Sequence, residues 1–285
     1  MLTAMMMLAL LAANAKRAVV VKPVANMYSQ PTEDAEVVSQ AIYGTTVGLL
    51  EEQSGWVKVR TEDQYSGWMP VASLRRLGPG EQPYATSGRV SQVESFFASI
   101  YREPDATKHQ PLVTVPFETR LELMDGGDKA ASDREFRWLK IHLPDDRAGW
   151  VQRGDVGFGS PPLGIAETVA FSKRFLGLPY LWGGVSTYGF DCSGFMQMLG
   201  RRRSVVLPRD ASQQAKWTGS QPLERGQLQP GDLVYFGQSK VTHTGMYLGD
   251  GQFISATTHE HPEVQISDLN DPYWSKLFIS ARRMQ

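Results

Sequence analysis

A spacing of two tryptophans recurs in the first half of the chain and strongly constrains its fold. Trp56 and Trp68 are 12 residues apart, and Trp138 and Trp150 repeat that interval. Each pair encloses a stretch in which apolar and polar residues alternate, as they do along a half-buried strand. An interval of this length accommodates a strand, a tight turn and a returning strand. The sequence therefore predicts two diverged copies of one small β unit.

Two segments rich in glycine and proline divide the chain. They cover residues 78–83 and 159–164, and their composition is typical of linkers and turns. We expect three domains, over residues 16–80, 81–160 and 161–285. The two β copies fill the first two domains, where the tryptophans are expected in the core, with ligand contact as the alternative.

The third segment has a different pattern, with helices followed by short strands. Apolar residues recur at near-helical spacing from Ile165 to Leu176, and Gly177 follows as a stop signal. A second helix is predicted to begin at Cys192. After Pro230 the apolar residues fall into short runs parted by glycines, which is typical of antiparallel strands. This order predicts an α+β domain, preceded by two small all-β barrels.

Residues 1–15 form an apolar run that predicts export. The run ends in Ala13-Asn14-Ala15, the small-x-small pattern of a signal peptidase site, although no Lys or Arg precedes it. We expect a cleaved signal peptide and a protein exported to the periplasm or cell envelope; a misassigned start or a buried N-terminal segment is the alternative. The run is too short to span a bilayer in the mature protein and no other segment qualifies, so no membrane span is expected.

The overall charge gives little guidance about partners. The 285 residues carry a formal net charge of −1, and 41% of them are hydrophobic, which is ordinary for a globular protein. Nothing in this balance indicates nucleic acid or an anionic membrane surface as a partner. We expect a monomer that binds neither.

Cys192 is the only cysteine in the sequence and the first candidate for a chemical role. A lone cysteine forms no intramolecular disulfide, and with a histidine elsewhere it is a candidate catalytic pair. At a helix start its thiol feels the positive end of the helix dipole, which lowers its pKa and favours the thiolate. Gly183, Gly184 and Gly189 precede it, so the sulfur is expected to face a groove, with backbone N–H groups nearby to stabilise an oxyanion. The alternative is a buried, inert thiol.

His243 is the strongest candidate for the base that such a cysteine needs. It begins the predicted strand 242–248, in which His243, Gly245 and Tyr247 share one face. A histidine beside a glycine that leaves space suits the wall of a cleft. The remaining histidines lie in the β copies or in a polar segment near the end of the chain and are weaker candidates: His109, His142, His259 and His261.

Short motifs in the third segment together resemble the NlpC/p60 cysteine peptidases. The motifs are Tyr180-x-Trp182-Gly183-Gly184, Asp191-Cys192-Ser193-Gly194-Phe195, Leu207-Pro208-Arg209, Gly231-Asp232-Leu233 and His243-x-Gly245-x-Tyr247-Leu248-Gly249. The resemblance implies a papain-like catalytic domain that cleaves peptide bonds in bacterial cell-wall stem peptides, with Cys192 as nucleophile and His243 as base. The two β copies resemble bacterial SH3-like domains, whose Gly-Trp strands and Tyr-x-x-Pro openings they reproduce.

One subgroup of that family is closer still, the γ-D-glutamyl-L-diamino acid endopeptidases with N-terminal SH3-like domains. Its members cleave after γ-linked D-glutamate, before the diamino acid, and require a free N-terminal L-alanine. The resemblance implies that Asp210 pairs with the substrate ammonium, for which a carboxylate is suited. It also implies that Tyr180 lines the site and that Tyr65 closes it, a solvent-exposed turn aromatic being the alternative for Tyr65. Further expected substrate contacts are Trp182, Asp191 and Ser193.

A free N-terminus is blocked while the stem peptide is attached to glycan. The expected substrate is therefore a short, released stem peptide, in cell-wall turnover or recycling. No metal or cofactor is expected, because His259 and His261 are the only clustered ligand candidates in the third domain and their surroundings lack a preformed donor set.

One position departs from the family pattern. The family usually places a second histidine 12 residues after the first to orient the imidazole, and Ser255 stands there. If residues 249–251 form a three-residue hairpin loop, Ser255 shares a sheet face with His243. Its hydroxyl is then expected to accept the Nδ1–H bond without supplying charge, which gives a weakened triad, with His259 as the alternative third member. Two other hypotheses stay open: a binding protein that has lost catalysis, and acyl transfer in place of hydrolysis.

Overall fold

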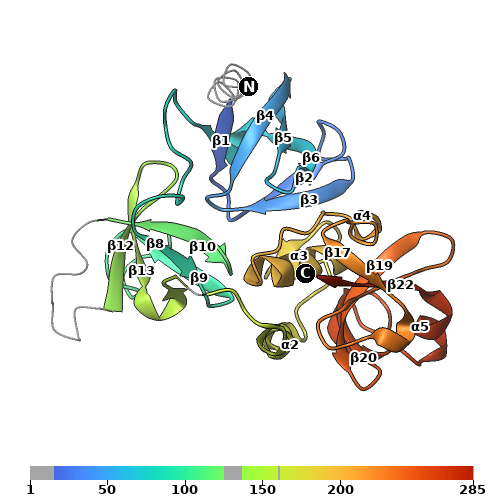
Figure 1. Cartoon of the computed structure of the whole chain (residues 1–285). Coiled ribbons are helices and arrows are strands. Elements are labelled where there is room, and N and C mark those ends of the chain that lie inside the picture. Colours follow the sequence, from blue (N-terminus) through green and yellow to red (C-terminus); the bar gives the residue numbers. More distant parts are fainter. Residues whose placement is uncertain (1–15, 125–136, 160, 285) are drawn as a thin grey trace, which may run out of the picture. The chain divides into compact units, whose positions relative to one another are not determined.

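The computed structural model describes residues 16–124, 137–159 and 161–284. The chain forms two compact units that divide between Ser160 and Pro161 (Figure 1). The predicted signal peptide, residues 1–15, lies outside the described residues. Within the described part of the chain, no helix has both the length and the apolar character needed to cross a membrane.

The first unit contains two antiparallel sheets of seven strands with the same topology. The first sheet has the order β3-β2-β6-β5-β4-β1-β7, and the second has β10-β9-β13-β12-β11-β8-β14, so each strand corresponds to the one seven places later. The strands of the first sheet are β1 Arg17–Val20, β2 Val24–Tyr28, β3 Val37–Ile42, β4 Thr46–Gln53, β5 Trp56–Arg60, β6 Ser66–Pro70 and β7 Leu74–Arg76. Those of the second are β8 Val90–Val93, β9 Phe97–Tyr101, β10 Val113–Pro116, β11 Arg120–Leu123, β12 Trp138–His142, β13 Ala148–Gln152 and β14 Val156–Gly157.

The tryptophan spacing that predicted the repeat corresponds to a strand pair in both sheets. Lys58 on β5 lies opposite Trp68 on β6, and Lys140 on β12 lies opposite Trp150 on β13. The first tryptophan of each pair contacts a tyrosine edge to face. The ring centroids are 5.4 Å apart for Tyr28 and Trp56, and 5.5 Å apart for Tyr101 and Trp138. The prediction of two copies of one β unit is confirmed.

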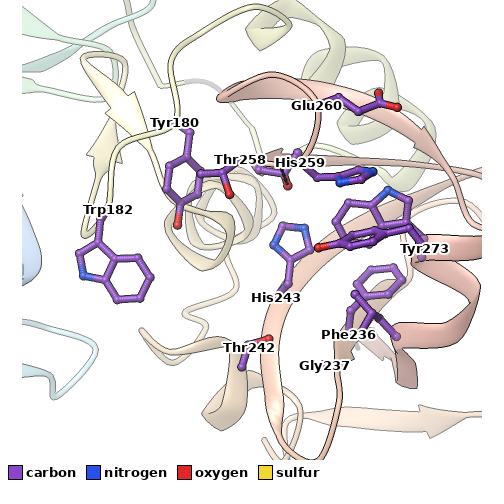
Figure 2. A pocket seen from close by; sticks show the side chains of 13 residues that line it. Tyr180, Trp182, Phe236, Gly237, Thr242, His243, Thr258, His259, Glu260 and Tyr273 are labelled. Atoms are coloured by element: carbon purple, nitrogen blue, oxygen red, sulfur yellow. Dashed lines mark hydrogen bonds between the residues drawn. The ribbon is translucent and has the colours of Figure 1, made fainter.

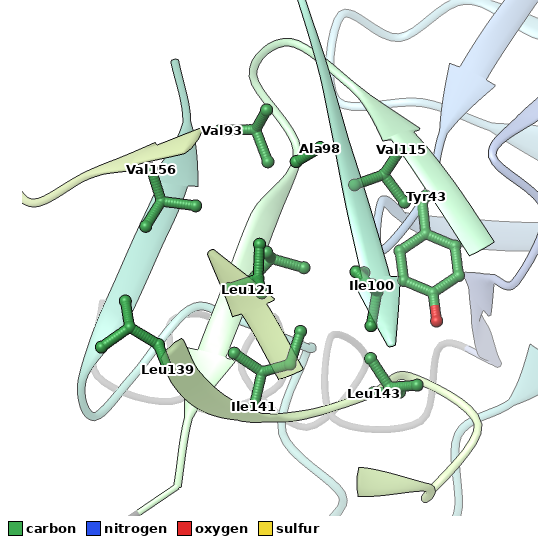
Figure 3. Packing of buried hydrophobic residues seen from close by; sticks show 11 residues of the cluster. Tyr43, Val93, Ala98, Ile100, Val115, Leu121, Leu139, Ile141, Leu143 and Val156 are labelled. Carbon is green, nitrogen blue, oxygen red and sulfur yellow. The ribbon is translucent and has the colours of Figure 1, made fainter. Parts of the chain in front are cut away.

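The second sheet has a hydrophobic core, which also includes one residue from the first half of the unit (Figure 3). Its members come from alternate positions of the strands, as the pleat requires. Tyr43, between β3 and β4, packs against this core and joins the two sheets within the unit. The other buried members are Val93, Ala98, Ile100, Val115, Leu121, Leu139, Ile141, Leu143, Val151 and Val156.

The second unit is an α+β domain built on a six-stranded sheet with the order β17-β22-β18-β19-β20-β21. Its strands are β17 Ser220–Leu223, β18 Leu233–Gly237, β19 Val241–Gly249, β20 Gln252–Thr257, β21 Glu263–Asp268 and β22 Phe278–Met284, with the small pair β15 Val185–Ser186 and β16 Gly189–Phe190 outside the sheet. Its α-helices are α2 Ile165–Ser172, α3 Cys192–Arg202, α4 Ala211–Gln214 and α5 Pro272–Leu277. The helix predicted from residue 165 ends at Ser172 and continues as a 3₁₀ turn, Lys173–Phe175.

Three phenylalanines hold α3 in place beside the sheet. Phe195 of α3 lies 5.8 Å from Phe175 and 5.5 Å from Phe190, measured between ring centroids. All three side chains are fully buried. Because α3 packs against β19 and β20, these contacts place its first residue, Cys192, next to the middle of the sheet.

Candidate active site

Asp191 sets the position at which α3 begins. Its backbone is extended, and its Oδ1 accepts a hydrogen bond of 2.7 Å from the backbone N–H of Gly194. An aspartate in this capping position satisfies an N–H group that has no partner within the helix. Cys192 therefore becomes the first residue of α3, as predicted from the sequence.

The carboxylate of Asp191 is also the centre of a buried polar network. Arg209 donates to both of its oxygens, at 3.1 Å and 2.5 Å, and the backbone N–H of Gly183 donates at 3.1 Å. Ser193 donates to Asp191 and accepts from Arg209 at 2.9 Å. The side chain of Arg209 is only 2% exposed. The structure thus places Asp191 and Ser193, both predicted as substrate contacts, in a network that fixes the start of the helix.

Glycines let the preceding loop lie directly on the first turn of α3. A Cβ atom on Gly194 would stand 2.2 Å from the carbonyl oxygen of Gly184, and one on Gly184 would stand 2.3 Å from the carbonyl oxygen of Gly189. These are contacts with backbone, which cannot move aside as a side chain can. Glycine is therefore required at both positions, because any larger residue would push the loop away from the helix.

Thr244 connects the nucleophile candidate to the strand that carries His243. Its backbone N–H donates a hydrogen bond to the sulfur of Cys192, as does the backbone N–H of Ser193. Thr244 directly follows His243 in β19. The structure therefore places Cys192 beside the strand that carries His243, a residue far from it in the sequence.

Ser255 contacts the imidazole of His243, but at the other nitrogen from the one predicted. Its Oγ lies 3.1 Å from Nε2, so the expectation of a bond to Nδ1 is wrong. Ser255 is fully buried on β20. With Nε2 engaged on the sheet side, Nδ1 remains as the ring nitrogen that can exchange a proton with a reacting group.

The hairpin between β19 and β20 also differs from the expected three-residue loop. Asp250 and Gly251 form a two-residue turn with φ values of 52° and 78°, and Gly249 pairs with Gln252. Two central residues with positive φ suit the right-handed twist of a hairpin. An irregularity in register between Tyr247 and Gly249 then brings Ser255 back to the sheet face that carries His243.

Burial keeps both members of the candidate pair uncharged at rest. It raises the pKa of Cys192 to about 12, and the charge of Asp191 adds to the effect, against the hydrogen bond from Thr244. It lowers the pKa of His243 to about 3, with a smaller contribution from His259. Cys192 is buried, with 8% of the residue exposed. The expectation of a thiol that faces a groove and has a lowered pKa is therefore wrong for this structure. Desolvation outweighs the helix dipole here.

Alkylation by iodoacetamide tests this neutral resting pair. Because only the thiolate reacts, a pKa raised to about 12 means that the reactive fraction grows as the pH rises toward that value. We expect the folded protein at pH 7 to react roughly 10³-fold more slowly than free cysteine, with the rate rising about tenfold per pH unit. The same chain unfolded in urea is the control and should react like free cysteine. Fast labelling that does not change between pH 5 and 9 would instead reveal a thiolate paired with an imidazolium.

Aromatic rings surround His243 on the side away from α3. Trp274 of α5 lies 5.0 Å from the imidazole, and Phe236 lies 5.9 Å from it, between ring centroids. His259 stacks on Tyr273 at 3.9 Å and meets Trp274 edge to face. His259 therefore lies close to His243, yet the hydrogen bond to the imidazole comes from Ser255. Sequence reasoning missed Trp274, because nothing in the sequence indicates that this segment returns to His243.

A pocket of about 420 Å³ opens beside His243 (Figure 2). Tyr180 and Trp182 lie on one side of it, and His259 and Tyr273 lie on the other. Burial raises the pKa of Tyr180, and its backbone pairs with that of Phe190, two residues before Cys192. The lining consists of Tyr180, Trp182, Phe236, Gly237, Thr242, His243, Thr257, Thr258, His259, Glu260, Tyr273, Trp274 and Leu277.

The remaining predicted site residues lie in two places. Asp210 immediately precedes α4, is half-buried, and does not cap that helix with its side chain. Tyr65 belongs to the first unit, in the turn between β5 and β6, where its half-buried ring packs against the core of the first sheet. No group of three His, Cys, Asp or Glu side chains among the described residues is arranged to hold a metal ion.

Two protein-family models match the sequence. The model described as NlpC/P60 family matches residues 177–283, and the model described as bacterial dipeptidyl-peptidase Sh3 domain matches residues 27–74. The chain is 31% identical over 271 residues to a γ-D-glutamyl-L-lysine dipeptidyl-peptidase of Bacillus cereus, covering 88% of this chain and 76% of the relative. It is 28% identical over 263 residues to the protein of that name from Bacillus subtilis, covering 88% and 82%.

A solved structure matches this chain over most of its length. It is the crystal structure of an NlpC/P60 family protein from Bacillus cereus ATCC 10987, with a TM-score of 0.79 and 25% sequence identity. The match covers 94% of this chain and 99% of that one. The predicted combination of SH3-like and papain-like domains is confirmed by this likeness and by the two family models.

Proposed function

The chain belongs to the NlpC/P60 family of peptidoglycan endopeptidases, and we propose that it is a cysteine peptidase that cleaves the γ-D-glutamyl to diamino acid bond of released stem peptides. The observation that carries the proposal is the position of Cys192 at the start of α3. Its sulfur accepts a hydrogen bond from Thr244, the residue after His243. A thiol and an imidazole on neighbouring elements are the two groups that acyl transfer to cysteine requires.

In the proposed reaction Cys192 loses its proton to His243 in the same step in which its sulfur attacks the substrate. The Cys192 thiol passes its proton to Nδ1 of His243 as the sulfur attacks the γ-carbonyl carbon, while Ser255 holds Nε2. The imidazolium then returns this proton to the nitrogen of the departing diamino acid, which leaves a thioester of L-Ala-γ-D-Glu on the sulfur. Water then attacks the thioester carbon while His243 takes its proton. The C–S bond breaks to release L-Ala-γ-D-Glu as the acid, and the imidazolium returns the proton to the sulfur, which restores the free thiol.

Relatives support this choice of bond and substrate. Both Bacillus proteins are named for a γ-D-glutamyl-L-lysine dipeptidyl-peptidase activity. A murein DD-endopeptidase, MepH of Escherichia coli, is 36% identical over 126 residues and supports a peptidoglycan-derived substrate. Export, which residues 1–15 predict, would bring the protein to that substrate.

We propose that Asp210 selects peptides with a free N-terminus. Its backbone carbonyl accepts the N–H groups of Gln213 and Gln214, while its side chain does not cap α4. A carboxylate directly before this helix, which packs against β19, is suited to a substrate ammonium.

Cleavage of matched peptides tests the proposal and the role of Asp210. We expect L-Ala-γ-D-Glu to be released from L-Ala-γ-D-Glu-L-Lys, and kcat/KM for the N-acetylated peptide to be about 10²-fold lower, because acetylation removes the charge that Asp210 pairs with. Asp210→Asn should lose a similar factor on the free peptide and little on the acetylated one. Mass spectrometry of the products measures both. Equal cleavage of the two peptides by the native protein would contradict the role of Asp210.

A peptide-binding protein without catalysis is the second candidate function. It is favoured by Ser255, which offers the imidazole a neutral hydroxyl, and by the raised pKa of Cys192. In that case the free peptide would bind in calorimetry and remain intact.

Acyl transfer in place of hydrolysis is tested by adding an amine acceptor, because the product would then carry the amine instead of a new carboxylate.

A further inference from the structure

The pocket beside His243 lies on the leaving-group side of the candidate active site. The imidazole must reach the departing nitrogen to protonate it, so the released residue occupies the side that the imidazole faces. His243 forms part of the pocket lining, whereas Cys192 and Asp210 do not. Tyr180 lines the pocket and pairs with Phe190, two residues before Cys192, so it joins the pocket to the segment that carries the nucleophile. The acyl part of a substrate would then lie toward α3 and α4, and the amine part in the pocket.

The walls of the pocket have the chemistry that suits an alkylammonium chain. Flat aromatic faces pack against methylene groups and attract a cation through their π electrons. Three threonine residues, Thr242, Thr257 and Thr258, add hydroxyl groups. The aromatic lining residues are Tyr180, Trp182, Phe236, Tyr273 and Trp274, together with the two histidines.

Glu260 supplies the only carboxylate among the described residues that line the pocket, and neither lysine nor arginine occurs there. It follows His259, whose ring is stacked on Tyr273, and lies at the edge of the pocket near that histidine (Figure 2). Its side chain is exposed, so it can turn toward a bound cation at little cost. The described lining therefore carries one negatively charged side chain, that of Glu260, and no lysine or arginine to balance it.

We propose that this pocket binds the side chain of the released diamino acid and that Glu260 pairs with its terminal ammonium. The inference rests on the proposed peptidase function and adds a preference between diamino acids. L-Lysine ends in a bare ammonium, which the aromatic walls and Glu260 both favour. Diaminopimelate carries a carboxylate beside its ammonium, which Glu260 repels and for which the lining holds no lysine or arginine partner.

Three peptides that differ only in the residue after γ-D-glutamate test the preference. They are L-Ala-γ-D-Glu-L-Lys, the same peptide with meso-diaminopimelate, and the same peptide with L-norleucine, which has a similar chain and no charge. We expect kcat/KM to be roughly fivefold to tenfold higher for the lysine peptide than for the diaminopimelate peptide. The ratio is modest because Glu260 is exposed and solvent screens its charge. The norleucine peptide should fall between them.

Variants of Glu260 assign that preference to its charge. Glu260→Gln should bring the lysine and diaminopimelate peptides to within about twofold of each other, and Glu260→Lys should reverse their order. Cleavage of the norleucine peptide should stay unchanged in Glu260→Gln, which shows that the catalytic groups are intact. Glu263→Gln is the matched control, because this nearby carboxylate does not line the pocket, and it should leave all three rates as they are.

The possible outcomes separate this inference from the function on which it rests. A preference for lysine that survives Glu260→Gln, or a native protein that cleaves all three peptides equally, overturns the assignment of Glu260 and leaves the peptidase in place. No cleavage of any of the three peptides by the native protein overturns the peptidase and the inference together.

Discussion

Cys192→Ala is expected to lower kcat/KM on L-Ala-γ-D-Glu-L-Lys by at least about 10³-fold. Removing the nucleophile of a covalent mechanism abolishes the acyl intermediate and leaves only binding and orientation. The chain contains no other cysteine that could take over the reaction. Product release measured by mass spectrometry, with the native protein assayed in parallel, gives the ratio.

A second variant separates loss of chemistry from loss of structure. Cys192→Ser keeps a side chain of similar size at the start of α3 and keeps an acceptor for the Thr244 N–H, but its hydroxyl is a far weaker nucleophile here. We expect both variants to melt within a few degrees of the native protein and to bind the peptide. Activity of Cys192→Ala within tenfold of the native protein would refute a cysteine mechanism.

Asp191→Asn is expected to destabilise the second unit by about 3–5 kcal/mol, because it leaves Arg209 charged and buried without its carboxylate. Arg209 is 2% exposed and donates to both oxygens of Asp191. An asparagine side chain can accept only one of those bonds and carries no charge. We expect the melting temperature to fall by roughly 10 °C or more, measured by calorimetry.

Asp210→Asn is the matched control for this stability prediction. It makes the same chemical change at a half-buried carboxylate that does not cap its helix. We expect a smaller fall in its melting temperature than for Asp191→Asn, because Asp210 is less buried, together with a loss of activity on the free peptide. If Asp191→Asn instead melted like the native protein and only raised KM, Asp191 would be the substrate contact that the sequence predicted.

The sequence by itself determined most of the architecture. The repeated interval between tryptophans corresponds to paired strands in two sheets of the same topology. Side chains of a strand alternate between its two faces, so two large rings 12 positions apart fit a strand, a turn and a returning strand. The order of helices and strands in the second unit also follows from local signals, such as Asp191 in the capping position of α3.

The environment of the site residues was decided only by the tertiary structure. Ser255 binds Nε2 of His243 because of a register irregularity between Tyr247 and Gly249, which no local pattern indicates. The pKa values of Cys192 and His243 shift in opposite directions because both are buried, and burial depends on packing between elements far apart in the chain.

Trp274 and Asp191 illustrate the same limit. Trp274 contacts the imidazole of His243 only because α5 returns to the sheet late in the chain. Asp191 belongs to a motif that the sequence shows plainly, yet its oxygens are taken by Arg209, which lies 18 positions further on. Residue type and spacing therefore identify the groups that can react, whereas their charge state and partners depend on long-range contacts that only the folded chain makes.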